Sequence, residues 1–96
     1  MGADEILRRY KNGERNFSKI ICSGDFAQMD LSGSDFSDSD LSFSSFRGCK
    51  LHRCNFARCN LQWTSFELAD LTGADITDAD VRWSILDNAI IDKTIL

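Results

Sequence analysis

An apolar residue stands at every fifth position from residue 26 to residue 96. A period of five matches neither an α-helix, which repeats every 3.6 residues, nor a β-strand, which repeats every two. It fits a backbone that turns a corner every five residues and points one large side chain inward on each side. We call these apolar residues the central residues of their repeats: Phe26, Leu31, Phe36, Leu41, Phe46, Leu51, Phe56, Leu61, Phe66, Leu71, Ile76, Val81, Leu86, Ile91 and Leu96.

The residue two positions before each central residue is small, with Met29 as the one exception. We expect both sets to face one crowded interior. This second set comprises Gly24, Met29, Ser34, Ser39, Ser44, Cys49, Cys54, Cys59, Thr64, Ala69, Ala74, Ala79, Ser84, Ala89 and Thr94.

Several repeats resemble the motif of the pentapeptide-repeat family: a small residue, Asp or Asn, Leu or Phe, then two variable residues. Close matches are Ser34-Asp35-Phe36-Ser37-Asp38, Cys54-Asn55-Phe56-Ala57-Arg58, Ala69-Asp70-Leu71-Thr72-Gly73 and Ala74-Asp75-Ile76-Thr77-Asp78. The resemblance covers residues 24–96. It implies an all-β solenoid, a right-handed quadrilateral β-helix with four repeats per coil and therefore about four coils in this chain.

On that fold, residues twenty apart stack on one another along the rod. Phe then alternates with aliphatic residues from side to side, and four inner columns result. The predicted columns are Phe26, Phe46, Phe66 and Leu86; Phe36, Phe56, Ile76 and Leu96; Leu31, Leu51, Leu71 and Ile91; and Ile21, Leu41, Leu61 and Val81.

Residues 1–16 depart from the repeat and form a predicted cap helix and turn, with residues 17–96 as the β-helix. Within residues 4–12, Ile6, Leu7 and Tyr10 share one helical face, and Gly13 is suited to end the helix. Such a helix would cover the first coil, whose backbone edge and apolar columns would otherwise meet water. Phe17 and Phe26 are nine residues apart instead of ten, so the register of the first coil is left open.

The last coil has no corresponding cap in the sequence. Ile85, Ile90 and Ile95 stand where Asp usually precedes the central residue, and the series closes on the apolar Leu96. One hypothesis is an end-to-end homodimer through these four residues. The alternative is that the native chain, or an adjoining one, continues the helix.

The cysteines and aspartates of the repeats are interpreted as structural. Cys49, Cys54 and Cys59 occupy inward positions whereas His52 points outward, so the four cannot converge on one metal ion. Buried free cysteine packs as a small hydrophobe. Asp and Asn before the central residue order turns through side-chain to backbone hydrogen bonds. We expect that role for Asp25, Asp30, Asp35, Asp40, Asn55, Asn60, Asp70, Asp75 and Asp80, and we expect no catalytic residue, cofactor or metal.

Among the outward positions, Phe43, Trp63 and Trp83 occupy the last place of their repeats at a spacing of twenty, with Gln62 and Arg82 alongside. They predict one exposed aromatic ladder. Exposed aromatic patches are typical of interfaces, but mutual stacking on a β-surface would also stabilise neighbouring coils. Both readings stay open.

The charge pattern bears on the class of partner. A net charge of −4 argues against direct nucleic-acid binding, and no segment is long enough to span a membrane, so we expect a cytoplasmic protein. The best-known role of the family is mimicry of duplex DNA by an acidic rod that inhibits gyrase, a type II topoisomerase. Here a basic belt interrupts the acidic residues: Arg47, Lys50, Arg53 and Arg58. The sequence therefore predicts a non-catalytic structural or protein-interaction module with an unknown protein partner, with the DNA mimic as the alternative.

Overall fold

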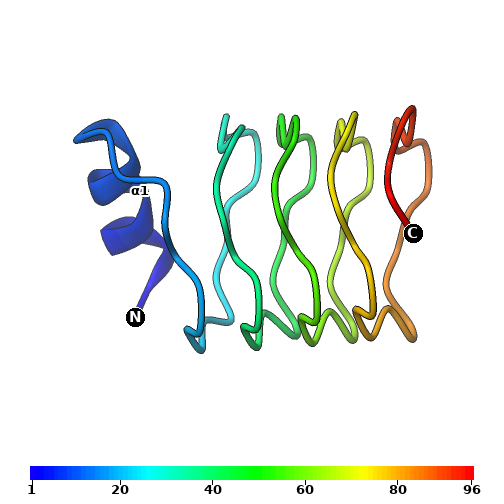
Figure 1. The fold of residues 1–96 in the computed structure, drawn as a ribbon, viewed down its shortest axis with the longest axis horizontal. Coiled ribbons are helices and arrows are strands. Elements are labelled where there is room, and N and C mark those ends of the chain that lie inside the picture. The colour runs from blue at the N-terminus through cyan, green and yellow to red at the C-terminus, as the bar shows by residue number, and fades with distance from the viewer.

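The computed structural model covers residues 1–96 and places one helix, α1 (Ala3–Lys11), at one end of a stack of coils (Figure 1). The rest of the chain winds around a single axis without long strands. Parallel backbone pairs recur every five residues and join residues twenty apart, as in Asp25 with Ser45 and Asp35 with Asn55. Four such pairs hold each coil to the next, so the coil has four sides. The solenoid implied by the resemblance to pentapeptide repeats is confirmed.

The interior is a pair of phenylalanine columns flanked by aliphatic ones. Phe46 stacks on Phe26 at 4.8 Å between ring centroids and on Phe66 at 5.4 Å, with the planes within 6°. It also meets Phe36 and Phe56 of the other phenylalanine column edge to face, at 6.1 and 5.6 Å. Stacked and edge-to-face arrangements are the favourable ones for aromatic pairs. The predicted stacking of residues twenty apart is therefore confirmed in the phenylalanine columns.

The residue before each central residue orders the turn that follows. Oδ1 of Asp35, for example, accepts a hydrogen bond of 2.9 Å from the backbone N–H of Ser37. The predicted role is confirmed at all the positions named for it: Asp25, Asp30, Asp35, Asp40, Asn55, Asn60, Asp70, Asp75 and Asp80.

The small inward residues also bond the coils together. The hydroxyl of Thr64 donates to the carbonyl of Leu41 at 3.0 Å, and the thiol of Cys54 donates to the carbonyl of Leu31 at 3.1 Å. Met29 is a correction, because its side chain is 38% exposed instead of inward. The other residues at this position, two before the central residue, are Gly, Ala, Ser, Cys or Thr. The longer Met29 side chain reaches solvent instead.

The first coil contains the second correction. Ile21 is 77% exposed, so its predicted place in the fourth inner column is wrong, and the neighbouring Cys22 is buried instead. Ile21 pairs with Asp40, nineteen residues on, and Phe17 likewise stacks on Phe36 at 5.6 Å. The residue missing from the repeat therefore lies between Cys22 and Phe26, which makes Phe17 and Cys22 the central residues of the first coil.

Helix α1 lies across the N-terminal end of the rod. Ile6 is fully buried there, and Leu7 and Tyr10 pack against the core as predicted. The hydroxyl of Tyr10 donates to the carbonyl of Ser32 at 2.8 Å, which fixes the helix to the coil beneath it. The helix ends in a Schellman motif: Gly13, with φ +94°, donates to the Tyr10 carbonyl, and the next residue donates to the carbonyl of Arg9.

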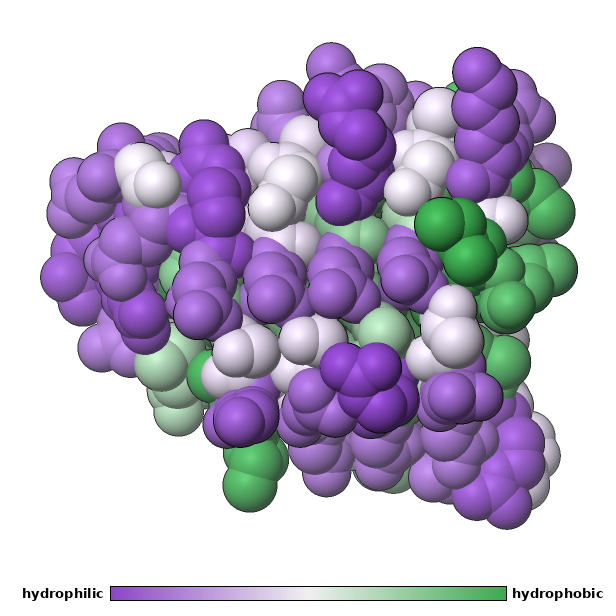
Figure 2. Space-filling view, in the orientation of Figure 1, coloured by the Kyte–Doolittle hydropathy of each residue, from purple (hydrophilic) through white to green (hydrophobic).

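At the opposite end the central residues face solvent. Val81, Leu86, Ile91 and Leu96 are 40, 43, 56 and 84% exposed, whereas the central residues from Phe26 to Leu71 are buried. The three isoleucines that precede central residues in this coil, Ile85, Ile90 and Ile95, are exposed as well. Figure 2 shows apolar residues gathered at this end of the molecule.

Candidate protein-contact surface

Phe43, Trp63 and Trp83 form a continuous aromatic ladder at one corner of the coil. The centroids of Phe43 and Trp63 are 6.4 Å apart and those of Trp63 and Trp83 are 5.2 Å apart, with interplanar angles of 11° and 12°. All three side chains remain more than half exposed, at 69, 53 and 56%. The structure therefore brings together the three residues that the spacing of twenty predicted.

The backbone of the ladder lies in the left-handed region. The φ angles of Phe43, Trp63 and Trp83 are 63°, 59° and 62°. This conformation suits Gly and costs other residues on the order of 1–2 kcal/mol each. At the neighbouring corners the same turn position is filled by Gly in several repeats, namely Gly33, Gly48 and Gly73. Nine other non-glycine residues share the left-handed conformation at this repeat position, so it is a feature of the repeat and does not distinguish the aromatic corner.

Gln62 and Arg82 lie beside the ladder and share one partner. Gln62 Nε2 donates to Oδ2 of Asp80 at 2.9 Å, and Arg82 forms two hydrogen bonds to the same carboxylate at 2.9 and 2.7 Å. The Arg82 guanidinium also lies 5.4 Å from the centre of the Trp83 ring, within cation–π range. The hydrogen bonds from Arg82 hold the pKa of Asp80 below its usual value, so the pair stays charged at neutral pH.

The sequence did not reveal one member of this neighbourhood, Asp80, nor one exposed apolar residue at a different corner, Leu68. Asp80 was assigned only a turn role, although it also anchors Gln62 and Arg82. Leu68 is 48% exposed at a left-handed turn position of another corner. The signal for Leu68 was available, since it is an apolar residue at the last place of its repeat.

Charged side chains on the other columns pair across coils, although not always within one column. Arg58 binds Asp38 through two hydrogen bonds of 2.8 and 3.2 Å. Asp70, however, is held by His52 Nε2 at 2.6 Å, whereas Lys50 in its own column forms no ion pair. Hydrogen bonds from Thr72 and His52 lower the pKa of Asp70 to about 2.

The three cysteines of one coil are separate, buried thiols. Burial raises the pKa of Cys54 to about 12 and those of Cys49 and Cys59 to about 11, so none is a thiolate at neutral pH. Each thiol donates to a backbone carbonyl of the preceding coil. No three His, Cys, Asp or Glu residues are arranged as a metal site.

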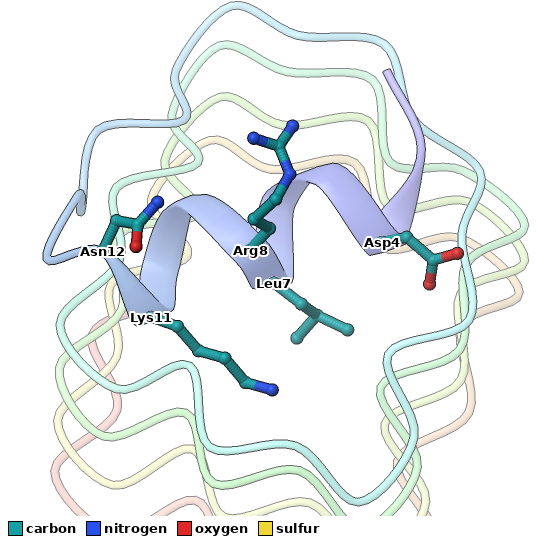
Figure 3. A pocket seen from close by; sticks show the side chains of 5 residues that line it. All are labelled: Asp4, Leu7, Arg8, Lys11 and Asn12. Carbon is teal, nitrogen blue, oxygen red and sulfur yellow. The ribbon is translucent and has the colours of Figure 1, made fainter.

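The one concavity lies on α1, away from the ladder. It is a shallow depression of about 390 Å³ lined by Asp4, Leu7, Arg8, Lys11 and Asn12 (Figure 3). Four of the five lining side chains are polar or charged, and none belongs to a predicted site. The single helix has nine residues, and no helix in the structure meets the length and apolar character that a membrane crossing requires.

A family model described as the pentapeptide repeat region matches residues 19–96. The chain belongs to the pentapeptide repeat family. None of the curated protein sequences gives a significant match.

Solved structures share this fold. A pentapeptide repeat protein from the Arabidopsis thaliana thylakoid lumen is 40% identical, with a TM-score of 0.70 over 71% of this chain and 47% of its own. Rfr23 from the cyanobacterium Cyanothece 51142 is 21% identical, with a TM-score of 0.66 over 83% of this chain and 61% of its own. HetL from Nostoc sp. strain PCC 7120, described as involved in heterocyst differentiation regulation, is 23% identical, with a TM-score of 0.55 over 84% of this chain and 48% of its own. The chain therefore spans about half to three fifths of the length of these relatives.

Proposed function

We propose that this protein is a non-catalytic interaction module, a rod of about four coils capped by α1, and that the aromatic ladder is its contact surface for a protein partner. The observation that carries the proposal is the exposure of Phe43, Trp63 and Trp83 as one continuous apolar strip. Large aromatic side chains are the most frequent anchors of protein interfaces. For a chain of 96 residues, a strip of three exposed aromatic side chains is a large apolar surface.

The stacking defines which parts of the rings a partner would meet. Both faces of Trp63 are turned toward neighbouring rings, Phe43 on one side and Trp83 on the other. The ring edges and the indole N–H groups are left for a partner. This geometry favours a protein surface with an apolar groove and hydrogen-bond acceptors, since a flat ligand such as a sugar ring would need a free aromatic face.

Polar residues at the edge of the ladder would set specificity. The ion pair of Arg82 with Asp80 fixes a guanidinium beside Trp83. A charged, oriented group at the rim of an apolar contact discriminates among partners more than it adds affinity.

No observation favours the DNA-mimic alternative. Opposite charges pair from coil to coil, as in Arg58 with Asp38 and Arg47 with Glu67. These pairs interrupt the acidic columns that a substitute for duplex DNA would present. We therefore do not extend the proposal to gyrase.

The test is affinity capture with a matched pair of variants. Trp63→Ser removes the middle ring of the ladder, whereas Leu68→Ser removes an exposed apolar side chain at an equivalent left-handed turn of another corner. With both variants shown to be folded by circular dichroism, we expect Trp63→Ser to reduce recovery of the partner about tenfold or more. Leu68→Ser should leave recovery unchanged. Equal recovery with the wild type and Trp63→Ser would mean that the ladder has only a structural role.

A further inference from the structure

The first coil lacks one residue at the corner next to Phe43. Ser23 is aligned with Ser42 of the following coil, because Ser23 Oγ donates to the Ser42 carbonyl at 2.6 Å. The next residue, Gly24, is already aligned with Ser44, because its N–H donates to Ser44 Oγ at 3.1 Å. No residue of the first coil is therefore aligned with Phe43, and this corner is the place of the residue missing from the repeat.

One face of the Phe43 ring is consequently free. Trp63 of the following coil stacks on the other face, and no second ring or guanidinium stacks on Phe43. Gly24 does not cover the free face, since a Cβ added to it would meet Ala3 of α1 at 2.9 Å. Phe43 is accordingly the most exposed ring of the ladder. Its free face can take one further planar group.

The carboxylate of Asp40 is open on the same side of the corner. Its Oδ1 accepts a turn hydrogen bond of 3.0 Å, as Oδ1 of Asp80 does, so Oδ2 is the outer oxygen in both residues. In Asp80 the outer oxygen accepts from Gln62 of the preceding coil and from Arg82. Oδ2 of Asp40 accepts from no group, because the preceding coil supplies only the short Ser23, whose hydroxyl donates elsewhere.

Arg82 shows which group fits beside such a carboxylate and ring. Its guanidinium donates to Asp80 at 2.9 and 2.7 Å and lies 5.4 Å from the centre of the Trp83 ring. Two coils earlier, Asp40 and Phe43 take the equivalent places, whereas a short serine stands in place of the arginine. A guanidinium stacks on aromatic faces and pairs with carboxylates through parallel N–H groups. A guanidinium from outside the chain therefore suits this corner.

We propose that Asp40 and Phe43 form a subsite for an arginine side chain of the protein partner. The guanidinium plane lies on the free face of Phe43, and its N–H groups donate to Oδ2 of Asp40. The inference rests on the proposed function, since it names the group that the partner brings to one end of the ladder.

The charge around the corner favours an arginine over a neutral ring. Asp40 forms no ion pair within the chain, and Asp25, which follows the shortened corner, is exposed and also without an ion pair. The chain as a whole has a net charge of −4. A neutral ring would stack on Phe43 equally well but would leave the Asp40 carboxylate without a partner.

An NMR titration of the full chain with a capped Gly-Arg-Gly peptide tests the subsite without the partner. We expect shifts of the amide signals around the shortened corner, chiefly those of Ser23, Gly24 and Phe43. For a single side chain, the dissociation constant should be on the order of 10–100 mM. A capped Gly-Lys-Gly peptide has the same charge on a group that is not planar, and it should bind about threefold more weakly or less.

Two variants each remove one half of the subsite, Asp40→Asn and Phe43→Leu. Both new residue types occupy the equivalent repeat positions elsewhere, as Asn60 and Leu68 do, so the fold should be kept. Each variant should raise the dissociation constant of the arginine peptide about threefold or more. Asp35→Asn is the matched control, because Asp35 has the same turn role on another side of the coil, and it should bind the peptide like the wild type.

Three outcomes would overturn the proposal. The first is the absence of shifts at this corner with up to about 100 mM arginine peptide, or shifts that Asp40→Asn and Phe43→Leu leave unchanged. The second is equal binding of the arginine and lysine peptides, which would mean attraction by charge alone. The third is stronger binding of methyl glucoside than of the arginine peptide, which would mean that the free face holds a sugar.

The peptide titration and the capture experiment with Trp63→Ser fail independently. Capture that depends on Trp63 without binding of the arginine peptide would overturn the arginine subsite alone. Binding of the arginine peptide together with capture that ignores Trp63→Ser would support the subsite and overturn the ladder as the contact surface.

Discussion

The two ends of the rod carry the same kind of residue at the same repeat position, yet only one end is covered. Beneath α1, Phe17, Phe26 and Leu31 are at most 1% exposed, whereas Leu86 and Leu96 of the last coil are 43 and 84% exposed. The repeat motif alone does not bury a central residue. Burial needs a neighbour on each side along the axis, either another coil or the nine-residue helix.

The two ends also differ in their backbone hydrogen bonds. Interior amides donate from coil to coil, as in Leu31 to the Lys50 carbonyl at 2.9 Å, and the Tyr10 hydroxyl satisfies the Ser32 carbonyl at the capped end. At the open end the corresponding groups have no partner. The stability of each coil is therefore expected to depend on its neighbours, with the last coil the least stable.

The largest expected effect on the free energy of unfolding comes from removing an interior ring, with a residue of the open end for comparison. Phe46 stacks between Phe26 and Phe66, so Phe46→Ala should lower the free energy of unfolding by about 3–5 kcal/mol. Leu86 lies in the same column, but its partial exposure should limit the cost of Leu86→Ala to about 1 kcal/mol. Urea denaturation of both variants measures the two losses. Similar losses for the two variants would show that the open end is as well packed as the interior.

A smaller effect is expected from loosening the cap. Ile6→Ala removes the one fully buried side chain of α1 and should cost about 2–4 kcal/mol. Arg8→Ala, on the exposed face of the same helix, is the control and should change stability by less than about 0.5 kcal/mol. The same denaturation experiment checks both. An Ile6→Ala variant as stable as Arg8→Ala would mean that α1 does not close the N-terminal end.

The smallest effect concerns one hydroxyl beneath the cap. Ser34 Oγ is buried with no hydrogen-bond partner, whereas Ser44 Oγ, at the equivalent position two sides further along the coil, donates to the Cys22 carbonyl at 3.0 Å. Ser34→Ala should therefore raise the free energy of unfolding by about 1 kcal/mol, and Ser44→Ala should lower it by a similar amount. Thermal unfolding of the two variants, measured side by side, shows whether each substitution raises or lowers the stability. Destabilisation by Ser34→Ala would show that the cap satisfies this hydroxyl as a coil would.

Most of the fold could be predicted because one period governs both burial and turn chemistry. Every fifth residue is apolar and the residue before it is often Asp or Asn. The pattern of core residues and the pattern of turn residues therefore indicate the same register. The prediction failed at Ile21, where the spacing from Phe17 to Phe26 is one residue short and counting back from Leu41 assigned the wrong residue. Only three-dimensional packing decides that the gap lies after Cys22.

The candidate site could be predicted in its members but not in its details. The spacing of twenty located Phe43, Trp63 and Trp83, because stacking follows directly from the coil length. The spacing did not predict which charged side chains pair with one another. Asp70 pairs with His52 and not with Lys50 of its own column, because side chains in neighbouring columns also come within hydrogen-bonding distance.

Amide hydrogen exchange tests the difference between the two ends most directly. Phe26 and Leu31 should exchange slowly, because their N–H groups bond to the next coil, while Leu86 and Ile91 should exchange close to the unprotected rate. Slow exchange at Leu86 and Ile91, or rapid exchange at both ends, would contradict the account.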